Sequence, residues 1–358
     1  MTDTALQRTQ IKRIVVRTPN WVGDAVMSIP ALRELRRLFP GAHVTLVAPP
    51  GTADLFIDAD FADGALKASH GTFGTINNAR VWKAGRFDLA VLLQNAFAAA
   101  ATAWLARVPV RVGYDTDRRG ALLTMALPLP VWRSERHESF YYLNIVSELE
   151  RIVKGTATVN TIEPRFDLRV SEERKTSAHR ILSEAGAKTG YPLAILCPGS
   201  INSRAKRWPA ERYAELSDQL AGAGVSVALI GSPGEIEVTT EVLANARSRP
   251  VALTGKTTVA EAVAIISIAD VLITNDTGPA HIAAALNTPT LVIFGPTNPL
   301  TTYPLSPRAQ IIRRPPDCAP CMLRDCPIDH RCMTAITPQE VFDRAAKLIQ
   351  VQAFQVFG

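Results

Sequence analysis

An acidic residue follows the first apolar run of the chain, in the stretch PNWVGDAV at residues 19–26. The run before it, Arg13–Arg17, is typical of a buried strand, and a glycine-rich phosphate loop often follows such a strand. This stretch holds one glycine, Gly23, and the carboxylate of Asp24 would repel a phosphate. The missing G-x-G-x-x-G pattern argues against a nicotinamide-dependent oxidoreductase, and it leaves open what the carboxylate of Asp24 does.

A candidate anion site lies in TNDTGPAH, residues 274–281, where an apolar run ends and a helical pattern opens with proline. The first amides of a helix bind anions, so we expect a diphosphate here. In the alternative, Asp276 or Thr277 only caps the helix, and His281 either lies over the diphosphate or packs inside the helix–sheet layer. The amides expected to point out of the helix start belong to Gly278, Ala280 and His281.

Two cations follow another apolar run in CPGSINSRAKRWP, residues 197–209. Lys206 and, as the weaker candidate, Arg207 could neutralise a leaving diphosphate beside Ser200. The alternative is an ordinary solvated loop, which is common for a single Lys-Arg pair.

An acid follows the run VSVALIG, in LIGSPGEIE. Either Glu235 or Glu237 could hold ribose hydroxyls, since an acid in this position often does. An acid in the first turn of a helix can equally serve only to complement the helix dipole.

Two further patterns are typical of metal sites. The D-x-D patterns at Asp58–Asp60 and Asp115–Asp117 arise readily by chance and do not follow strong strands, so we assign no metal to them. Four cysteines have the spacing C-x2-C-x4-C-x5-C, which suits either a structural metal or reduced thiols. These are Cys318, Cys321, Cys326 and Cys332.

The composition is that of a globular protein, with 358 residues, 47% hydrophobic and 20% charged. The formal charge of +6 and the pI near 9.2 favour anionic partners. Only 6% of residues are aromatic and no basic run alternates with aromatics, so we predict no nucleic-acid partner. The N-terminus lacks the apolar region of a signal peptide, which predicts a cytoplasmic protein.

The elements that must position these residues alternate between strand and helix patterns, as in α/β folds with parallel sheets. The stretch 89–106 has the length of a membrane span but reads better as a strand followed by a helix. Pro30 predicts that a helix begins near Ser28 or is kinked. Other expected strands are HVTLVA, LAILC, VSVALIG, VAL, VLIT and TLVIFG, with helices from Pro209, from about Glu235, at 259–269 and at 279–286. We place a linker near 164–170, between domains at 1–168 and 169–358, and the last helix could pack back on the first domain.

Five stretches together resemble glycosyltransferase family 9, the bacterial lipopolysaccharide heptosyltransferases, and come closest to its type II enzymes. The resemblance covers nearly the whole chain, in order. The stretches are NWVGDAVMSIPALRELRRLFP, RVGYDTDRRG, CPGSINSRAKRWP, TNDTGPAHIAAALNTPTLVIFGPTNP and CAPCMLRDCPIDHRCM.

The resemblance implies a GT-B fold, with two Rossmann-like domains facing each other across a cleft. The first would bind the acceptor and the second the sugar nucleotide. It implies an inverting, metal-independent enzyme without a cofactor, which moves L-glycero-D-manno-heptose from ADP-heptose to the first heptose of the lipopolysaccharide inner core, lipid A-Kdo-heptose. The live alternatives are a type I enzyme or a member with another donor or acceptor; a non-catalytic sugar-nucleotide-binding module would not need Asp24.

The resemblance also places the roles of the site residues. The family's base falls on Asp24, its nucleotide-site lysine on Lys206 and its aspartate on Asp276, with Thr277 and Gly278 at the diphosphate. The ribose acid stays open between Glu235 and Glu237. An acidic glycolipid acceptor and the anionic inner membrane surface would suit a basic first domain, although a mixed solvated surface is the alternative. The arginines we expect at the acceptor are Arg111, Arg118 and Arg119.

Overall fold

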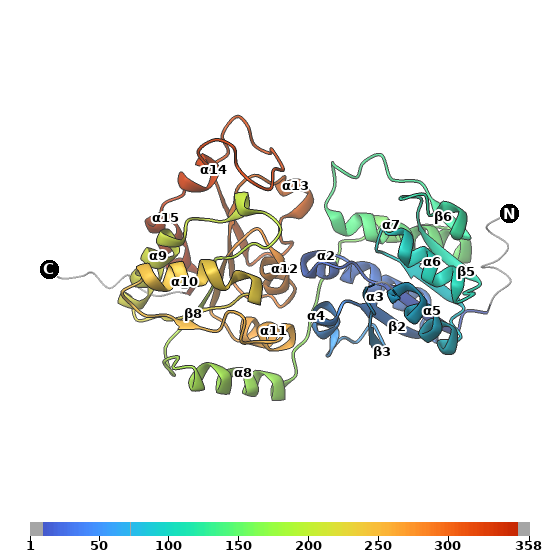
Figure 1. The fold of residues 1–358 in the computed structure, drawn as a ribbon, viewed down its shortest axis with the longest axis horizontal. Coiled ribbons are helices and arrows are strands. Elements are labelled where there is room, and N and C mark those ends of the chain that lie inside the picture. Colours follow the sequence, from blue (N-terminus) through green and yellow to red (C-terminus); the bar gives the residue numbers. More distant parts are fainter. Residues whose placement is uncertain (1–9, 72, 350–358) are drawn as a thin grey trace. The chain divides into compact units, whose positions relative to one another are not determined.

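The computed structural model describes residues 10–71 and 73–349, and by its contacts the chain divides into a unit that ends at Phe166 and a unit that begins at Asp167. Each unit is an α/β domain built on its own sheet (Figure 1). The predicted linker, 164–170, spans this division and contains no helix or strand.

The first unit holds a six-stranded parallel sheet in the order β3-β2-β1-β4-β5-β6. Val15, in the middle of β1, pairs with Thr45 of β2 on one side and with Ala90 of β4 on the other. The chain order therefore reverses between β1 and β4, which is where doubly wound folds bind ligands. The strands are β1 (Arg13–Arg17), β2 (His43–Ala48), β3 (Gly64–Lys67), β4 (Leu89–Leu92), β5 (Val110–Tyr114) and β6 (Met125–Leu127).

Helices cover both faces of this sheet. Helices α5 and α6 pack together on the face that presents Val15 and Ala90, and α3 and α7 pack together. Pro30 is the second residue of α3, so the predicted helix start near Ser28 is confirmed. The helices are α2 (Val22–Met27), α3 (Ile29–Leu38), α4 (Pro50–Ala53), α5 (Gly74–Gly85), α6 (Phe97–Leu105) and α7 (Glu138–Lys154), with 3-10 turns η1 (Asp54–Phe56), η2 (Gly120–Leu122) and η3 (Val159–Thr161).

The second unit repeats this topology, with strands in the order β12-β11-β10-β7-β8-β9, all parallel. Ile273 of β10 pairs with Leu196 of β7 and Leu291 of β11, so the order reverses between β7 and β10. The strands are β7 (Leu193–Cys197), β8 (Ser226–Leu229), β9 (Val251–Ala252), β10 (Val271–Asn275), β11 (Thr290–Phe294) and β12 (Ala309–Arg313).

The helices of the second unit pack on its own sheet. Helix α15 contacts α9, β10 and β11, and its Val341 and Ala345 are fully buried there. The packing of the last helix on the first domain stays a prediction. The residues after Ile349 lie outside the described part. The helices are α8 (Glu172–Glu184), α9 (Ala210–Gly222), α10 (Ile236–Asn245), α11 (Val259–Ser267), α12 (Gly278–Ala285), α13 (Pro299–Thr302), α14 (Arg331–Thr334) and α15 (Pro338–Ile349), with 3-10 turns η4 (Arg204–Lys206) and η5 (Pro233–Glu235).

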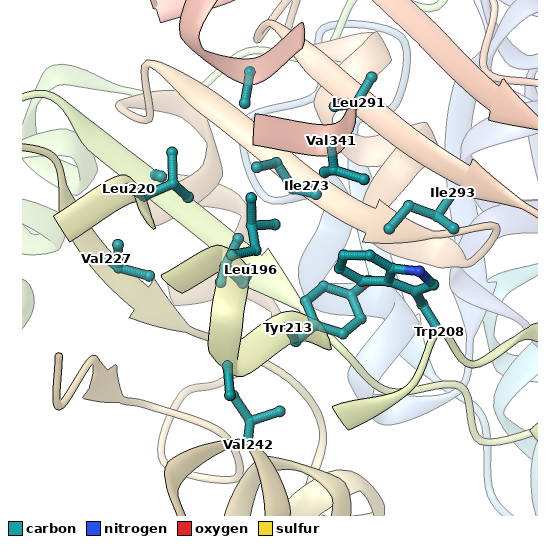
Figure 2. Packing of buried hydrophobic residues seen from close by; sticks show 14 of the residues in the cluster. Leu196, Trp208, Tyr213, Leu220, Val227, Val242, Ile273, Leu291, Ile293 and Val341 are labelled. Atoms are coloured by element: carbon teal, nitrogen blue, oxygen red, sulfur yellow. The ribbon is translucent and has the colours of Figure 1, made fainter. Parts of the chain in front are cut away.

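Trp208 anchors the segment between β7 and α9 in the core of the second unit (Figure 2). Its ring packs edge-on against Tyr213, with the centroids 4.9 Å apart, and its indole N–H donates to the carbonyl of Ile336 at 3.0 Å. Lys206 lies two residues before Trp208 in the chain. The packing of Trp208 in the apolar core therefore fixes the backbone from which the lysine side chain extends.

The predicted α/β fold class, two Rossmann-like domains, is confirmed. The stretch 89–106 forms β4 and α6, as predicted, and none of the helices within 10–71 and 73–349 has the length and apolar character needed to cross a bilayer. Four strands, β3, β5, β6 and β12, were not predicted from the sequence. Both β3 and β12 are edge strands with several half-exposed or exposed residues, so they lack the continuous apolar run of a buried strand.

Candidate active site

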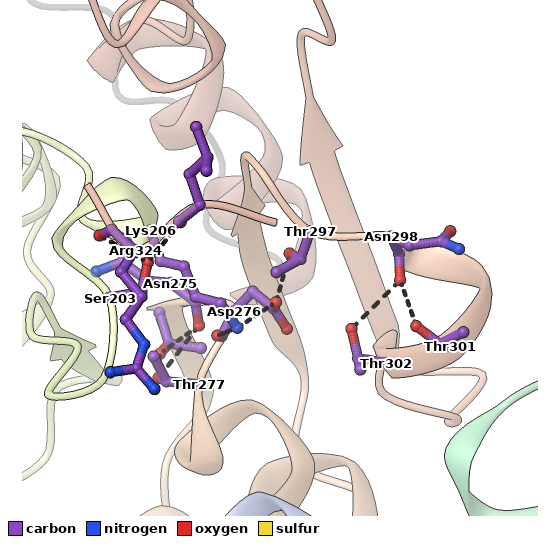
Figure 3. Close-up of polar contacts among 12 residues, drawn as sticks. Ser203, Lys206, Asn275, Asp276, Thr277, Thr297, Asn298, Thr301, Thr302 and Arg324 are labelled. Atoms are coloured by element: carbon purple, nitrogen blue, oxygen red, sulfur yellow. Dashed lines mark hydrogen bonds and ion pairs between the residues drawn. The ribbon is translucent and has the colours of Figure 1, made fainter. Parts of the chain in front are cut away.

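The carboxylate of Asp276 lies at the end of β10 and forms an ion pair with Lys206. The lysine Nζ lies 2.9 Å from Oδ2 of Asp276 and 3.1 Å from its backbone carbonyl, and the hydroxyl of Thr297 donates to the same Oδ2 at 2.6 Å (Figure 3). The side chain of Asp276 is 2% exposed and that of Lys206 is 25% exposed. The predicted cation and acid therefore meet where the strand order of the second unit reverses.

Asn275 joins the two strands on either side of this reversal. Its amide nitrogen donates to the carbonyls of Pro198 and Gly199, which follow β7, at 2.8 and 3.1 Å. Its amide oxygen accepts from the backbone N–H of Trp208 and the hydroxyl of Tyr213. Because this side chain is fully buried, it holds both flanks of the Lys206 segment against β10.

The start of α12 departs from the predicted anion site in one respect. Thr277 precedes the helix in an extended conformation, and its carbonyl accepts the amide of Ala280 at 3.0 Å. The amide of Ala280 is therefore engaged within the turn, which corrects the expectation that it points outward. The amides of Gly278 and His281 remain the candidates for an anion in this turn.

His281 is buried inside the helix–sheet layer, with 6% of its surface exposed. Burial lowers the pKa of His281 to about 4, and the neighbouring ammonium of Lys206 adds to this, while Asp276 opposes it. The ring is therefore neutral at pH 7.

Glu235 rather than Glu237 faces the strand ends. One carboxylate oxygen of Glu235 accepts from the backbone N–H and the hydroxyl of Ser232, both at 2.8 Å, which forms a capping box. The carboxylate also lies against Gly199, where any β-carbon would overlap it. Glu237 is exposed on α10.

Arg207 and Ser200 lie on the segment that follows β7. The Nε of Arg207 donates to the carbonyl of Ser200 at 3.1 Å, and the side chain of Arg207 is half-buried. Ser200 itself is 3% exposed. This contact orders the loop that carries Lys206.

The cysteine-rich segment supports the turn η4, at whose end Lys206 lies. The carbonyl of Arg324 accepts the backbone N–H of Ala205 at 2.9 Å, and Ser203 donates to the same carbonyl at 3.1 Å. On the other side of the turn, Nε2 of His330 lies 2.6 Å from the carbonyl of Ala205. The segment therefore fixes both sides of the η4 backbone.

The four clustered cysteines lie in one region. Burial raises the pKa of Cys332, and the other three thiols contribute to the shift. Cys332 is buried, Cys321 is intermediate, and Cys318 and Cys326 are exposed. Within the described ranges, no three His, Cys, Asp or Glu side chains are arranged to hold a metal ion, the D-x-D patterns included.

Asp24 lies in the first turn of α2, directly after β1 and in the first unit. Helix α2 contacts α7, whose first residue is Glu138. Burial raises the pKa of Glu138 to about 7, and the negative charge of Asp24 adds to the increase, while Arg133, 3.6 Å away, opposes it. The structure thus brings a second carboxyl group into the electrostatic neighbourhood of Asp24.

Of the three arginines predicted to bind an acceptor, Arg118 is exposed and the other two are engaged inside the first unit. Arg119 is fully buried and donates to the carbonyls of Tyr114 and Gln94 and to the side chain of Asn95. Each of its three side-chain nitrogens therefore has an acceptor within the first unit, and its role at the acceptor stays a prediction. Arg111 donates to two backbone carbonyls at 2.6 and 2.7 Å, which ties down the same loop.

Sequence reasoning missed Asn275, Thr297 and Glu138. Asn275 and Thr297 lie inside the motif TNDTGPAHIAAALNTPTLVIFGPTNP, but neither has a residue type that marks it as functional without its partners. Glu138 lies far from Asp24 in the sequence, so no local pattern connects the two.

Comparison with known proteins connects this geometry to one family. The model of glycosyltransferase family 9 (heptosyltransferase) matches residues 78–331. The chain is 31% identical to lipopolysaccharide heptosyltransferase 2 of Salmonella typhimurium, over 94% of this chain and 98% of that protein. It is 32% identical to lipopolysaccharide heptosyltransferase 2 of Escherichia coli K12, over 95% and 100%.

A solved structure is similar to this chain over nearly its full length. ADP-heptose lps heptosyltransferase II of E. coli matches with a TM-score of 0.80 and 29% identity, over 94% of this chain and 98% of that one. The fold is therefore GT-B, and the chain belongs to glycosyltransferase family 9 and is a heptosyltransferase.

Proposed function

We propose that this enzyme transfers L-glycero-D-manno-heptose from ADP-heptose to the first heptose of the lipopolysaccharide inner core. The observation that carries the proposal is the Lys206–Asp276 pair beside the start of α12. The likeness over the full length of type 2 heptosyltransferases, one of which is described as an ADP-heptose enzyme, supports the choice of donor and acceptor.

The second unit would hold the donor. The diphosphate would accept hydrogen bonds from the amides of Gly278 and His281 and from Thr277, with Lys206 as the nearest cation. Arg207 would assist from the loop after β7, with Ser200 beside it. Glu235, which lies against Gly199, would accept the ribose hydroxyls.

The first unit would supply the base. The hydroxyl of the acceptor sugar loses its proton to Asp24 while its oxygen attacks the anomeric carbon of the donor. The bond from that carbon to the diphosphate breaks, and ADP leaves with the electron pair. Attack on the face opposite the leaving group inverts the configuration. The negative charge that develops on ADP would be stabilised by Lys206 and the helix amides.

The acceptor is an acidic glycolipid, so the proposal includes a basic surface near the membrane. Arg118 is the exposed arginine of the predicted set and could contact the acceptor or the anionic cytoplasmic face of the inner membrane. Arg111 and Arg119 would act as positioning residues that hold the loop bearing Arg118.

The test is transfer by the purified protein from ADP-heptose to inner-core acceptors that carry zero or one heptose, with the products weighed by mass spectrometry. We expect one heptose to be added to the acceptor that already carries one, and no product from GDP-mannose. Transfer only to the heptose-free acceptor would refute the assignment and favour a type I enzyme. Unchanged turnover in Asp24→Ala would remove the proposed base.

A further inference from the structure

A cavity of about 210 Å³ lies in the first unit, at the carboxyl ends of its strands. It is lined by Arg17 at the end of β1, Val47 of β2 and Gln94 just after β4, so it lies where the strand order reverses. Doubly wound folds bind ligands in this position. All of the residues that line it belong to the first unit.

Arg17 brings an uncompensated positive charge to this cavity. It is only 8% exposed, and its guanidinium donates to the carbonyls of Thr18 and Val47 at 2.7 and 3.3 Å and to the side-chain oxygen of Asn20 at 2.8 Å. All of these acceptors are neutral. Burial lowers the pKa of Arg17 to about 10, so the side chain is still charged at pH 7, and no carboxylate contributes to the shift within the described ranges.

The rest of the lining suits a small polar ligand. Neutral polar side chains come from three separate segments, and Trp82 and Ala99 supply apolar surface. The volume lies below the range of about 300–1,000 Å³ for drug-sized ligands, so the cavity would admit an acidic group with part of its sugar rather than a nucleotide. The neutral polar side chains are Asn20, Ser69, Thr75, Asn78 and Gln94, and His70 also lines the cavity.

A buried arginine with only neutral partners is stabilised when an oxyanion completes its hydrogen bonds and neutralises its charge. We propose that this cavity binds a sugar-linked oxyanion, a phosphate or a carboxylate, paired with Arg17. The inference rests on the proposed function, in which the acidic glycolipid acceptor is the source of this oxyanion. Free inorganic phosphate shares the same chemistry and is the alternative source.

The experiment measures binding to the full chain without any donor. Mannose 6-phosphate, mannose and inorganic phosphate are titrated separately and followed by the shift in Tm and by calorimetry. We expect saturable binding of mannose 6-phosphate, no binding of mannose, and weaker binding of inorganic phosphate. Arg17→Met should weaken the binding of mannose 6-phosphate at least tenfold, and Arg17→Lys should retain part of it.

Two further variants keep the test decisive. Arg13→Met changes an exposed arginine at the opposite end of β1 and should bind normally. Ala98→Trp alters an exposed residue that lines the cavity, so it should block binding without removing the buried Arg17.

Absence of saturable binding, or binding that both Arg17→Met and Ala98→Trp leave unchanged, would overturn the site. Inorganic phosphate binding as tightly as mannose 6-phosphate would overturn the sugar-linked ligand. Because no transfer is measured, this result is independent of the heptosyl-transfer assay, and the failure of one is distinguishable from the failure of the other.

Discussion

The ammonium of Lys206 lies 2.9 Å from the carboxylate of Asp276, although 69 residues separate them in the chain and they belong to segments after two different strands. The carboxylate is almost completely buried, and the neutral hydroxyl of Thr297 donates a hydrogen bond to it. A buried carboxylate of this kind fixes the position of its cation, which supports a role for Lys206 in binding a second anion.

Removing that cation should affect both turnover and stability. For Lys206→Met we expect kcat to fall by about 10²–10³, because stabilisation of the leaving group is lost. The free energy of unfolding should fall by about 3 kcal/mol, since Asp276 is left buried without its partner. Steady-state kinetics and urea unfolding measure the two effects.

A matched control is Lys188→Met, which alters an exposed lysine in the same unit and should change neither quantity. The double variant Lys206→Met/Asp276→Asn should recover part of the stability but none of the turnover. If Lys206→Met lost stability with an unchanged kcat, the pair would be structural only.

Asp24→Asn should lower kcat by about 10²–10⁴, the usual contribution of a general base, because the amide cannot accept the proton of the acceptor. The affinity for ADP, measured by calorimetry, should be unchanged, since Asp24 belongs to the other unit. A kcat close to that of the wild type would contradict the assignment.

Glu138 should titrate near neutral pH. Because its pKa is raised to about 7 in the folded protein, from an ordinary value of 4.5, the folded state holds this proton more tightly. The stability that it contributes is complete below pH 4.5 and is lost as the pH rises through 7, by up to about 3 kcal/mol. Urea unfolding of Glu138→Gln should lack this loss.

The pKa of Glu138 should also depend on the charge of Asp24. In Asp24→Asn, the pKa of Glu138 measured by ¹³C NMR should move down toward its ordinary value, because one cause of the increase is removed. Burial is the larger cause, so the shift should be partial. An unchanged pKa would show that the two carboxyl groups do not interact.

His281 should make the free energy of unfolding fall at acidic pH, which is the opposite of the pH dependence expected from Glu138. Its pKa is lowered to about 4 when folded, so the unfolded chain binds the proton first, and stability is lost as the pH falls through 6.5 toward 4. Between pH 7 and 5 this amounts to about 2 kcal/mol. His281→Gln should lack this share of the loss in urea unfolding, and an identical pH dependence would contradict the burial of a neutral ring.

His330 should act as a positioning residue for Lys206. Its Nε2 must carry the proton that the carbonyl of Ala205 accepts, so His330→Ala should loosen η4. We expect kcat to fall several-fold with little change in the KM for the acceptor, and His330→Gln to restore part of it. Equal loss of activity in the Ala and Gln variants would argue against this hydrogen bond.

The sequence by itself determined the two parallel sheets and the strand ends that carry chemistry. Strands such as Leu193–Cys197 and Val271–Asn275 are buried on both faces, so they must be continuous apolar runs, and the polar residue that ends each run is visible in the sequence. Asp276 directly follows such a run, and Asp24 and Lys206 lie in the segments that follow two others. Short edge strands such as Gly64–Lys67 carry no such pattern and were missed.

The tertiary structure alone decided which polar groups are available. Arg119 and Arg118 are neighbours of the same charge, yet one is buried against backbone carbonyls and the other is exposed. Likewise, the structure turns Glu235 rather than Glu237 toward Gly199, and it leaves Arg17 buried beside a cavity, where its hydrogen-bond acceptors among the described residues are all neutral. Hydrogen bonding and burial depend on segments far apart in the chain, so a local pattern can indicate that a side chain is able to bind but not whether the fold has already used it.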